Sequence, residues 1–249
     1  MLSVAAINVA PVKALGLAQP HRVRLESEGV PEDRRLFLLR EDGSVATLRT
    51  HPRLTSVRPD LDLHACTLGL TFPDGSVTGS VLEPREAVGA ELFGRRRNGH
   101  VVPGEVAGAL SELAGERLRL VLADRTGEGW DEGPVSVLAR ASVQQVGTPE
   151  SGERSARRFR MLFEVAGAEP FVEDTWIGRR IRIGEAVVRV THALGRCLVI
   201  NHDPDDGAKN WRGLHTLAEH RPDLTLGVIA DVVEPGEVRV GDRLVVDST

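Results

Sequence analysis

The sequence predicts a mainly β protein with a few short helices. Short runs rich in Val, Ile and Leu recur along the 249 residues. Asp42-Gly43 and Asp74-Gly75 lie between such runs, where Asp-Gly pairs are typical of hairpin turns. Helical periodicity is confined to a few short segments. Many short strands at close spacing indicate a sandwich or barrel rather than an alternation of strands and helices.

Eight runs illustrate the strand pattern. The segment from Val187 to Val190 alternates in the way that suits a pleated, half-buried surface. We expect strands over residues 4–9, 22–26, 36–40, 67–72, 117–122, 180–183, 186–190 and 243–246.

Three segments carry a helical pattern. Residues 105–114 place Val106, Ala109, Leu110 and Leu113 on one face of a helix. Residues 214–220 predict a second, short helix that ends before Pro222. A third helix is expected to start near Ser142.

Composition excludes several classes of protein. The chain has 31 Lys and Arg against 36 Asp and Glu, a net charge of −5, which argues against a nucleic-acid partner. The one compact basic cluster, residues 95–97, is interpreted as a solvated loop. The N-terminus lacks a charged signal-peptide region, and no apolar stretch is long enough to span a bilayer, so no membrane partner is expected. The two isolated cysteines suit a reducing compartment, and we expect the cytoplasm.

Cys197 lies in the most informative segment. It follows Arg196 and precedes a short apolar run, residues 198–201, which we interpret as a buried strand. Residues 203–207 read Asp-Pro-Asp-Asp-Gly and predict the turn that closes it. An adjacent guanidinium favours the thiolate, the form that binds soft metals or attacks sulfur. The alternative is a buried structural cysteine.

Several short motifs, taken together, resemble one family. They are residues 10–13 (Ala-Pro-Val-Lys), 29–35, 47–49 and 52–54 in the first half, and 158–160, 173–176, 196–197, 203–207 and 240–242 in the second. The chain is similar to MOSC-domain proteins with an N-terminal β-barrel partner domain, which include the amidoxime-reducing components. The resemblance implies a MOSC β-barrel packed with an N-terminal barrel-type domain, with boundaries expected at residues 1–95 and 96–249.

The resemblance also implies a cofactor site. Cys197 would be the protein ligand to molybdenum, which in a pterin dithiolene prefers soft sulfur. Lys13, Arg34 and Arg160, with Arg196, would hold the anionic molybdenum cofactor, because guanidinium and ammonium groups suit phosphate. The three cations are expected to converge on one cleft. Arg34 and its neighbour in the sequence would alternate across a strand, so that one faces away.

Two further residues receive roles. Ser142, near a predicted helix start, matches a family position that contacts the pterin, and helix N-termini favour anions. Asp203 is a candidate for proton delivery because it follows the thiol in sequence, although a structural role in its turn is an alternative.

The leading functional hypothesis is a molybdenum-dependent oxidoreductase that removes oxygen from small N-hydroxylated or similar substrates. No iron–sulfur or pyridoxal-phosphate domain is expected, so electrons would come from a separate donor protein. Ala14 and Leu162 stand where related reductases carry Ser and an amide. These departures favour a second hypothesis, in which Cys197 carries sulfur as a persulfide or acts as a nucleophile without metal. A third is a non-catalytic cofactor carrier.

Overall fold

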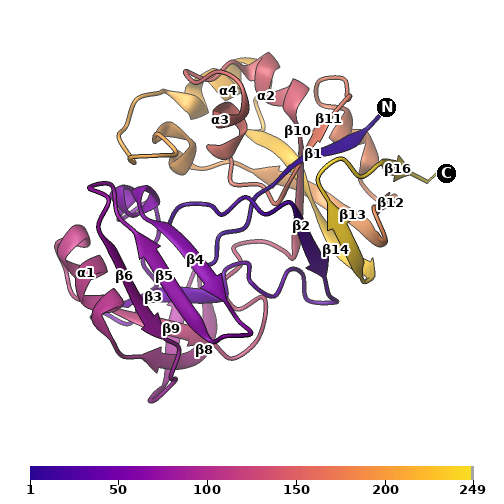
Figure 1. Cartoon of the computed structure of the whole chain (residues 1–249). Helices are drawn as coiled ribbons and strands as arrows, with labels where there is room; N and C mark the ends of the chain where they lie inside the picture. Colours follow the sequence, from indigo (N-terminus) through magenta and orange to yellow (C-terminus); the bar gives the residue numbers. More distant parts are fainter. Residues whose placement is uncertain (248–249) are drawn as a thin grey trace.

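The chain folds into two β units that lie side by side (Figure 1). The computed structural model describes residues 1–247, apart from the side chain of Glu153. The larger unit contains the C-terminal half of the chain together with the first strands, so both termini lie in it (Figure 1). The smaller unit is built from residues between these first strands and β10.

A seven-stranded sheet forms the larger unit. Main-chain hydrogen bonds from Val4 N to Asp242 O (2.9 Å) and from Leu244 N to Leu2 O (3.0 Å) bring its first and last strands together, so the sheet nearly closes into a barrel. In spatial order the strands are β1 (Ser3–Ile7), β11 (Phe163–Ala166), β10 (Val135–Ala139), β14 (Thr225–Glu234), β13 (Ala186–Gly195), β12 (Arg180–Ile183) and β16 (Leu244–Val246). A two-stranded sheet of β2 (Arg22–Leu25) and β15 (Gly236–Arg239) adjoins it.

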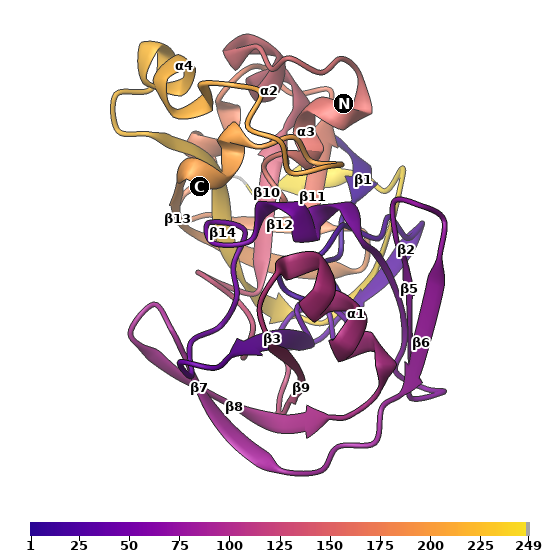
Figure 2. The ribbon, with the colours of Figure 1, turned by 90° about the vertical axis from the view of Figure 1, so that its left-hand side faces the viewer.

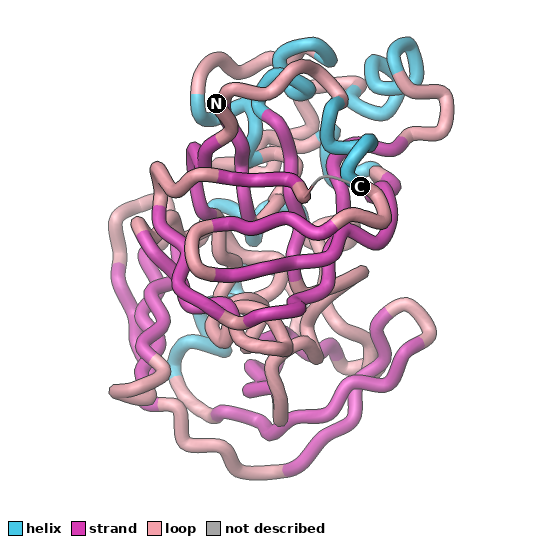
Figure 3. The backbone as a smooth tube through the Cα atoms, turned by 90° about the vertical axis from the view of Figure 1, so that its right-hand side faces the viewer, coloured by secondary structure: helices cyan, strands magenta, loops and turns pink. Residues whose placement is uncertain are grey.

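Apolar side chains fill this barrel, and Trp176, Phe163 and Leu162 are among its buried members. Helices gather at one end of the barrel (Figure 3). They are α2 (Arg140–Val146), α3 (Glu153–Arg157) and α4 (Gly213–His220), with the 3-10 helices η2 (Val172–Trp176) and η3 (Leu198–Asn201). No helix among residues 1–247 is long and apolar enough to cross a membrane.

The smaller unit consists of two antiparallel sheets, with α1 packed against them on the outer side (Figure 2). One sheet has the order β3 (Leu36–Arg40), β9 (Leu118–Ala123), β8 (Arg95–Val102) and β7 (Ala87–Leu92). The other contains β4 (Arg58–Asp62), β5 (Thr67–Thr71) and β6 (Val77–Val81). Val106 and Leu110 of α1 (Glu105–Ala114) are buried in the core between the sheets, beside the 3-10 helix η1 (Pro52–Ser56).

The mainly β fold and the expected elements are confirmed. Each of the eight predicted strands is present, with its ends moved by at most a few residues except for β13, which continues to Gly195. The helix predicted over residues 105–114 has these same bounds, the second begins one residue early at Gly213, and Ser142 lies in the first turn of α2. The Asp74-Gly75 turn joins β5 to β6 as a hairpin.

Four local expectations were wrong. Residues 198–201 form η3 instead of a strand, because the run is short, pairs with no neighbouring strand and exposes Leu198. Arg34 lies in a turn with a φ of 53°, not on a strand. The basic cluster at residues 95–97 begins β8 and is not a loop. The boundary expected between residues 95 and 96 would cut through β8 and its four-stranded sheet, so α1 and β9 belong to the smaller unit.

Candidate functional site

A cavity of about 340 Å³ lies between the two units. Its volume is within the range of pockets that hold small molecules and cofactors. The smaller unit contributes Arg49 and Phe93, and the barrel contributes Leu162, Arg196 and Cys197. Three further cations line the same cavity, namely Lys13, Arg34 and Arg160. The predicted convergence of these cations with the thiol in one cleft is therefore present.

Cys197 stands at the point where β13 has ended and η3 begins. Its backbone is extended, and its carbonyl accepts a hydrogen bond from Ile200 N at 3.2 Å, the first turn of η3. The residue is half-buried, and its thiol is in no disulfide. A free thiol at the wall of a cavity is available to a metal or a substrate.

Arg196 anchors the start of the Cys197 segment to neighbouring main chain. Its Nε donates to Leu226 O at 2.8 Å and its Nη1 donates to Phe159 O at 3.1 Å, while its guanidinium lies over the Phe159 ring. Burial lowers the pKa of Arg196 to about 10. Several N–H donors of Arg196 are already bonded to main-chain carbonyls, so fewer are available to a phosphate. The position of Arg196 therefore suits holding the Cys197 loop in place better than binding the cofactor.

Lys13 is a buried cation at the cavity wall. Its Nζ donates to Gly129 O at 3.1 Å and to Asp131 Oδ1 at 2.6 Å. Burial lowers the pKa of Lys13, and the nearby cations Arg34 and Arg160 lower it further, whereas Asp131 raises it. A buried ammonium is costly unless an anion faces it, so this position favours an anion in the cavity.

Arg34 and Arg160 are both held in left-handed backbone conformations with φ of 53°. Asp33 accepts a charge-assisted hydrogen bond from Arg34. The same carboxylate accepts a hydrogen bond from Ala10 N at 2.8 Å, which holds the Asp33–Arg34 pair against the main chain at Ala10. Arg160 Nη2 donates to Leu15 O at 2.7 Å. Burial, together with Arg34, lowers the pKa of Arg160 to about 10. Three cations thus share two carboxylates, and the cluster has a net positive charge.

Ser142 is not among the residues that line the cavity. It is buried in α2, where its Oγ donates to Glu173 Oε2 at 2.9 Å and accepts from Phe171 N at 2.7 Å. Burial raises the pKa of Glu173. The hydroxyl is occupied by a structural contact with η2, so its predicted contact with a pterin has no support from its position.

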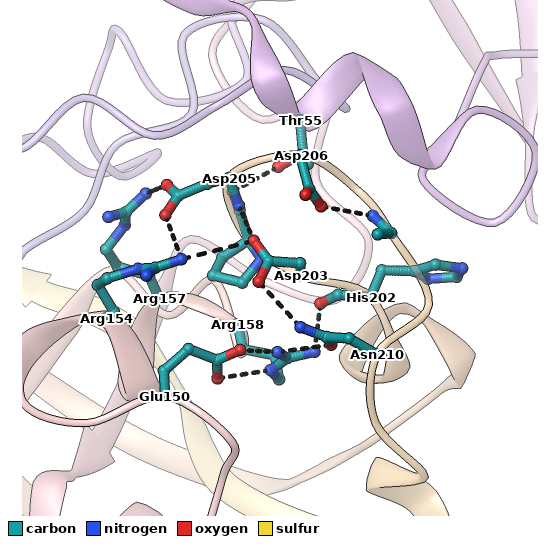
Figure 4. Close-up of polar contacts among 12 residues, drawn as sticks. Thr55, Glu150, Arg154, Arg157, Arg158, His202, Asp203, Asp205, Asp206 and Asn210 are labelled. Carbon is teal, nitrogen blue, oxygen red and sulfur yellow. Dashed lines mark hydrogen bonds and ion pairs between the residues drawn. The ribbon is translucent and has the colours of Figure 1, made fainter.

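Asp203 also lies outside this cavity, in a polar network (Figure 4). Its carboxylate accepts hydrogen bonds from Asp205 N at 2.8 Å and Asn210 Nδ2 at 2.9 Å. The turn that it begins packs against η1, because Gly207 leaves no space for a Cβ beside Pro52. These contacts are those of a turn residue, which was the alternative role for Asp203, and its part in proton delivery stays a prediction.

The residues fit an anionic cofactor with a soft metal better than a metal held by protein alone. Residues 1–247 contain no cluster of three or more His, Cys, Asp and Glu side chains that could hold a metal ion. The cavity instead offers one thiol and several cations, Lys13, Arg34 and Arg160 among them. A thiolate suits a soft metal, and the cations suit phosphate. This donor set matches a pterin cofactor that brings most of its own metal ligands.

The sequence matches two family models. Residues 1–117 match the MOSC N-terminal beta barrel domain, and residues 124–245 match the MOSC domain. The chain is therefore a MOSC-domain protein with an N-terminal MOSC β-barrel domain, and both family assignment and fold class agree with the sequence prediction. The two models leave residues 118–123, strand β9, unmatched, and the sheet pairing places β9 with β3 and β8 in the smaller unit.

Individual relatives are distant. The chain is 25% identical over 254 residues to a molybdenum cofactor sulfurase from Danio rerio, covering 88% of this chain but only 30% of that protein. It is 25% identical over 253 residues to a mitochondrial amidoxime reducing component 2 from Macaca fascicularis, covering 84% of this chain and 72% of that protein. The YUAD protein from Bacillus subtilis is a solved structure with a TM-score of 0.49 and 13% identity, covering 100% of this chain and 97% of that one.

Sequence reasoning missed Asp131, which contacts the most buried of the three cations. The only local signal was the neighbouring Gly133-Pro134, which predicts a loop. Nothing in the sequence shows that this loop returns to Lys13, because 118 positions separate the two residues.

Proposed function

We propose that this protein binds molybdenum cofactor in the cavity between its two units and reduces small N-hydroxylated or similar substrates. The convergence of Lys13, Arg34, Arg160 and Cys197 on one cavity is the observation that carries this proposal. The relatives named for molybdenum cofactor and for amidoxime reduction support the same class of function.

Each group has a distinct part in this proposal. Lys13, Arg34 and Arg160 bind the anionic end of the cofactor, and Cys197 donates its thiolate to the metal. When bound, the cofactor would supply a redox-active metal suited to oxygen-atom transfer. Leu162 and Ile200 line the cavity with apolar surface, which excludes water from the thiol side. The overall reaction consumes two electrons and two protons, and the substrate oxygen leaves as water. A separate donor protein supplies the electrons.

The experiment is purification from a host that makes the cofactor, followed by molybdenum and pterin analysis and an assay with a chemical reductant. The proposal predicts about one molybdenum and one pterin per chain, with substrate-dependent oxidation of the reductant. Protein that contains the cofactor but shows no turnover with any N-hydroxylated substrate would instead indicate a carrier.

Metal-free sulfur transfer is the second candidate. The cavity wall beside the cations is apolar at Ala14 and Leu162, which removes two possible polar contacts to a pterin. In this case Cys197 would carry a persulfide or attack a carbon–sulfur bond. Purified protein without molybdenum, but with a persulfide on Cys197 detected by alkylation and mass spectrometry, would favour it.

A further inference from the structure

The cation cluster already holds an anion that belongs to the protein. Asp131 Oδ1 lies 2.6 Å from Lys13 Nζ, inside the cavity that the thiol also lines. Burial alone would raise the pKa of Asp131, but Lys13, Arg34 and Arg160 together lower it below the ordinary value. The carboxylate is therefore ionised and faces the same cations that a phosphate would need.

The main chain before Asp131 is fixed. Gly129 O accepts a hydrogen bond from Lys13 Nζ, and Trp130 O accepts one from Arg97 Nη2 at 3.0 Å. A side chain at Gly129 would collide with the backbone of Arg34, so this glycine allows the close approach. These contacts hold the loop against the cation cluster independently of the Asp131 carboxylate.

The Asp131 side chain itself is free to leave. Half of it is exposed (49%), whereas the Lys13 side chain is only 6% exposed. Among residues 1–247, Lys13 is the only hydrogen-bond or ion-pair partner of this carboxylate, so rotation about the side-chain bonds of Asp131 suffices to vacate the site. Water can solvate the carboxylate once it has turned outward, whereas the buried ammonium cannot follow it.

We propose that Asp131 is a built-in anion that occupies the Lys13–Arg34–Arg160 cluster of the cofactor-free protein and is displaced by the phosphate of the incoming ligand. This inference rests on the proposed function for the identity of that ligand. The carboxylate stabilises the buried ammonium when the site has no other anion. It also makes the site selective, because a phosphate dianion carries more charge than the carboxylate that it replaces, and a monoanion does not.

The test compares the cofactor-free wild type with Asp131→Asn and with Glu132→Gln. Glu132 is the next residue, is also exposed and lines the same cavity, but its carboxylate faces His192 at 3.9 Å. Both variants remove one negative charge and keep the side-chain shape. Calorimetric titration with inorganic phosphate should give about tenfold tighter binding to Asp131→Asn, the size expected when a charged hydrogen-bonding competitor is removed. Glu132→Gln should bind phosphate within about twofold of the wild type.

A second measurement guards against misfolding. Phosphate should raise the melting temperature of Asp131→Asn by more than that of the wild type, because a tighter ligand stabilises the folded state more. Equal phosphate affinity in all three proteins would overturn the inference, and so would weaker binding to Asp131→Asn, which would make Asp131 a ligand contact. Pterin analysis of the wild type tests the proposed function separately. Tighter phosphate binding to Asp131→Asn, in a protein whose wild type contains no pterin, would support the role of Asp131 as a built-in anion and would contradict the proposed binding of molybdenum cofactor.

Discussion

Replacing Lys13 by methionine tests the anion site at its most buried cation. The chain has two lysines, Lys13 and Lys209, and Lys209 is exposed. Lys209→Met is therefore a matched control that removes the same charge from a position that does not line the cavity.

The magnitude follows from the contacts of the ammonium. Lys13 Nζ is buried and points to Gly129 O and Asp131. A hydrogen bond from a charged donor contributes about 1.5–3 kcal/mol, so losing it should weaken phosphate binding about tenfold to a hundredfold. Stability should change by only about 1 kcal/mol, because methionine fills similar space and the half-exposed Asp131 can turn to water.

Two assays separate these effects. Urea unfolding gives the stability of each variant, and pterin retained through purification gives the affinity. We expect Lys13→Met to lose the pterin while it unfolds near the wild-type midpoint, and Lys209→Met to behave as wild type. Full pterin retention by a folded Lys13→Met protein would refute the anion site.

Four further predictions address neighbouring features. Ser142→Ala should lower the free energy of unfolding by about 1–3 kcal/mol, measured by urea unfolding, since it removes the side-chain donor to Oε2 of the buried Glu173, and it should leave pterin retention unchanged. Loss of pterin without loss of stability would restore Ser142 as a cofactor contact. Asp205→Asn should lower the free energy of unfolding by about 1 kcal/mol in urea, because Arg58 of the smaller unit and Arg157 of the larger unit both pair with Asp205. An unchanged unfolding midpoint would show that these ion pairs do not stabilise the protein. Above about pH 8 phosphate is already a dianion, so any further change in its affinity reports on the protein. Because the pKa of Lys13 is lowered from the ordinary value of 10.5, the ammonium should lose its proton below pH 10.5 and phosphate affinity should fall. A calorimetric affinity that stays constant up to pH 10.5 would contradict the lowered pKa. Leu162→Asn should lower stability by about 2–4 kcal/mol in thermal unfolding, because the side chain is only 2% exposed, and a stable variant with better pterin retention would show that the amide reaches the cofactor.

The strands and helices were predictable where the apolar pattern was long or regular. Residues 105–114 show one apolar face over three turns, and the structure has this helix with the same bounds. Residues 198–201 are too short for a pattern to distinguish a strand from a helical turn. Their 3-10 conformation depends on the tertiary contacts of the loop that contains Cys197.

The site was predictable only in part. Family motifs indicated Lys13, Arg34 and Arg160, and the fold brings all three to the cavity of Cys197. Asp131 could not be predicted, because its role depends on a contact between distant parts of the chain. A position near a helix start does not reveal which way a hydroxyl points, and the hydroxyl of Ser142 points to Glu173.

The sulfur coordination of the metal shows whether Cys197 is the protein ligand to molybdenum. X-ray absorption at the molybdenum edge should be compared between the wild type and Cys197→Ser, both purified from a cofactor-competent host. We expect the wild-type metal to have one more sulfur neighbour than the metal in Cys197→Ser, and the variant to remain folded with its pterin held by the cations. Identical sulfur coordination in the two proteins, or wild-type protein without molybdenum, would contradict this expectation.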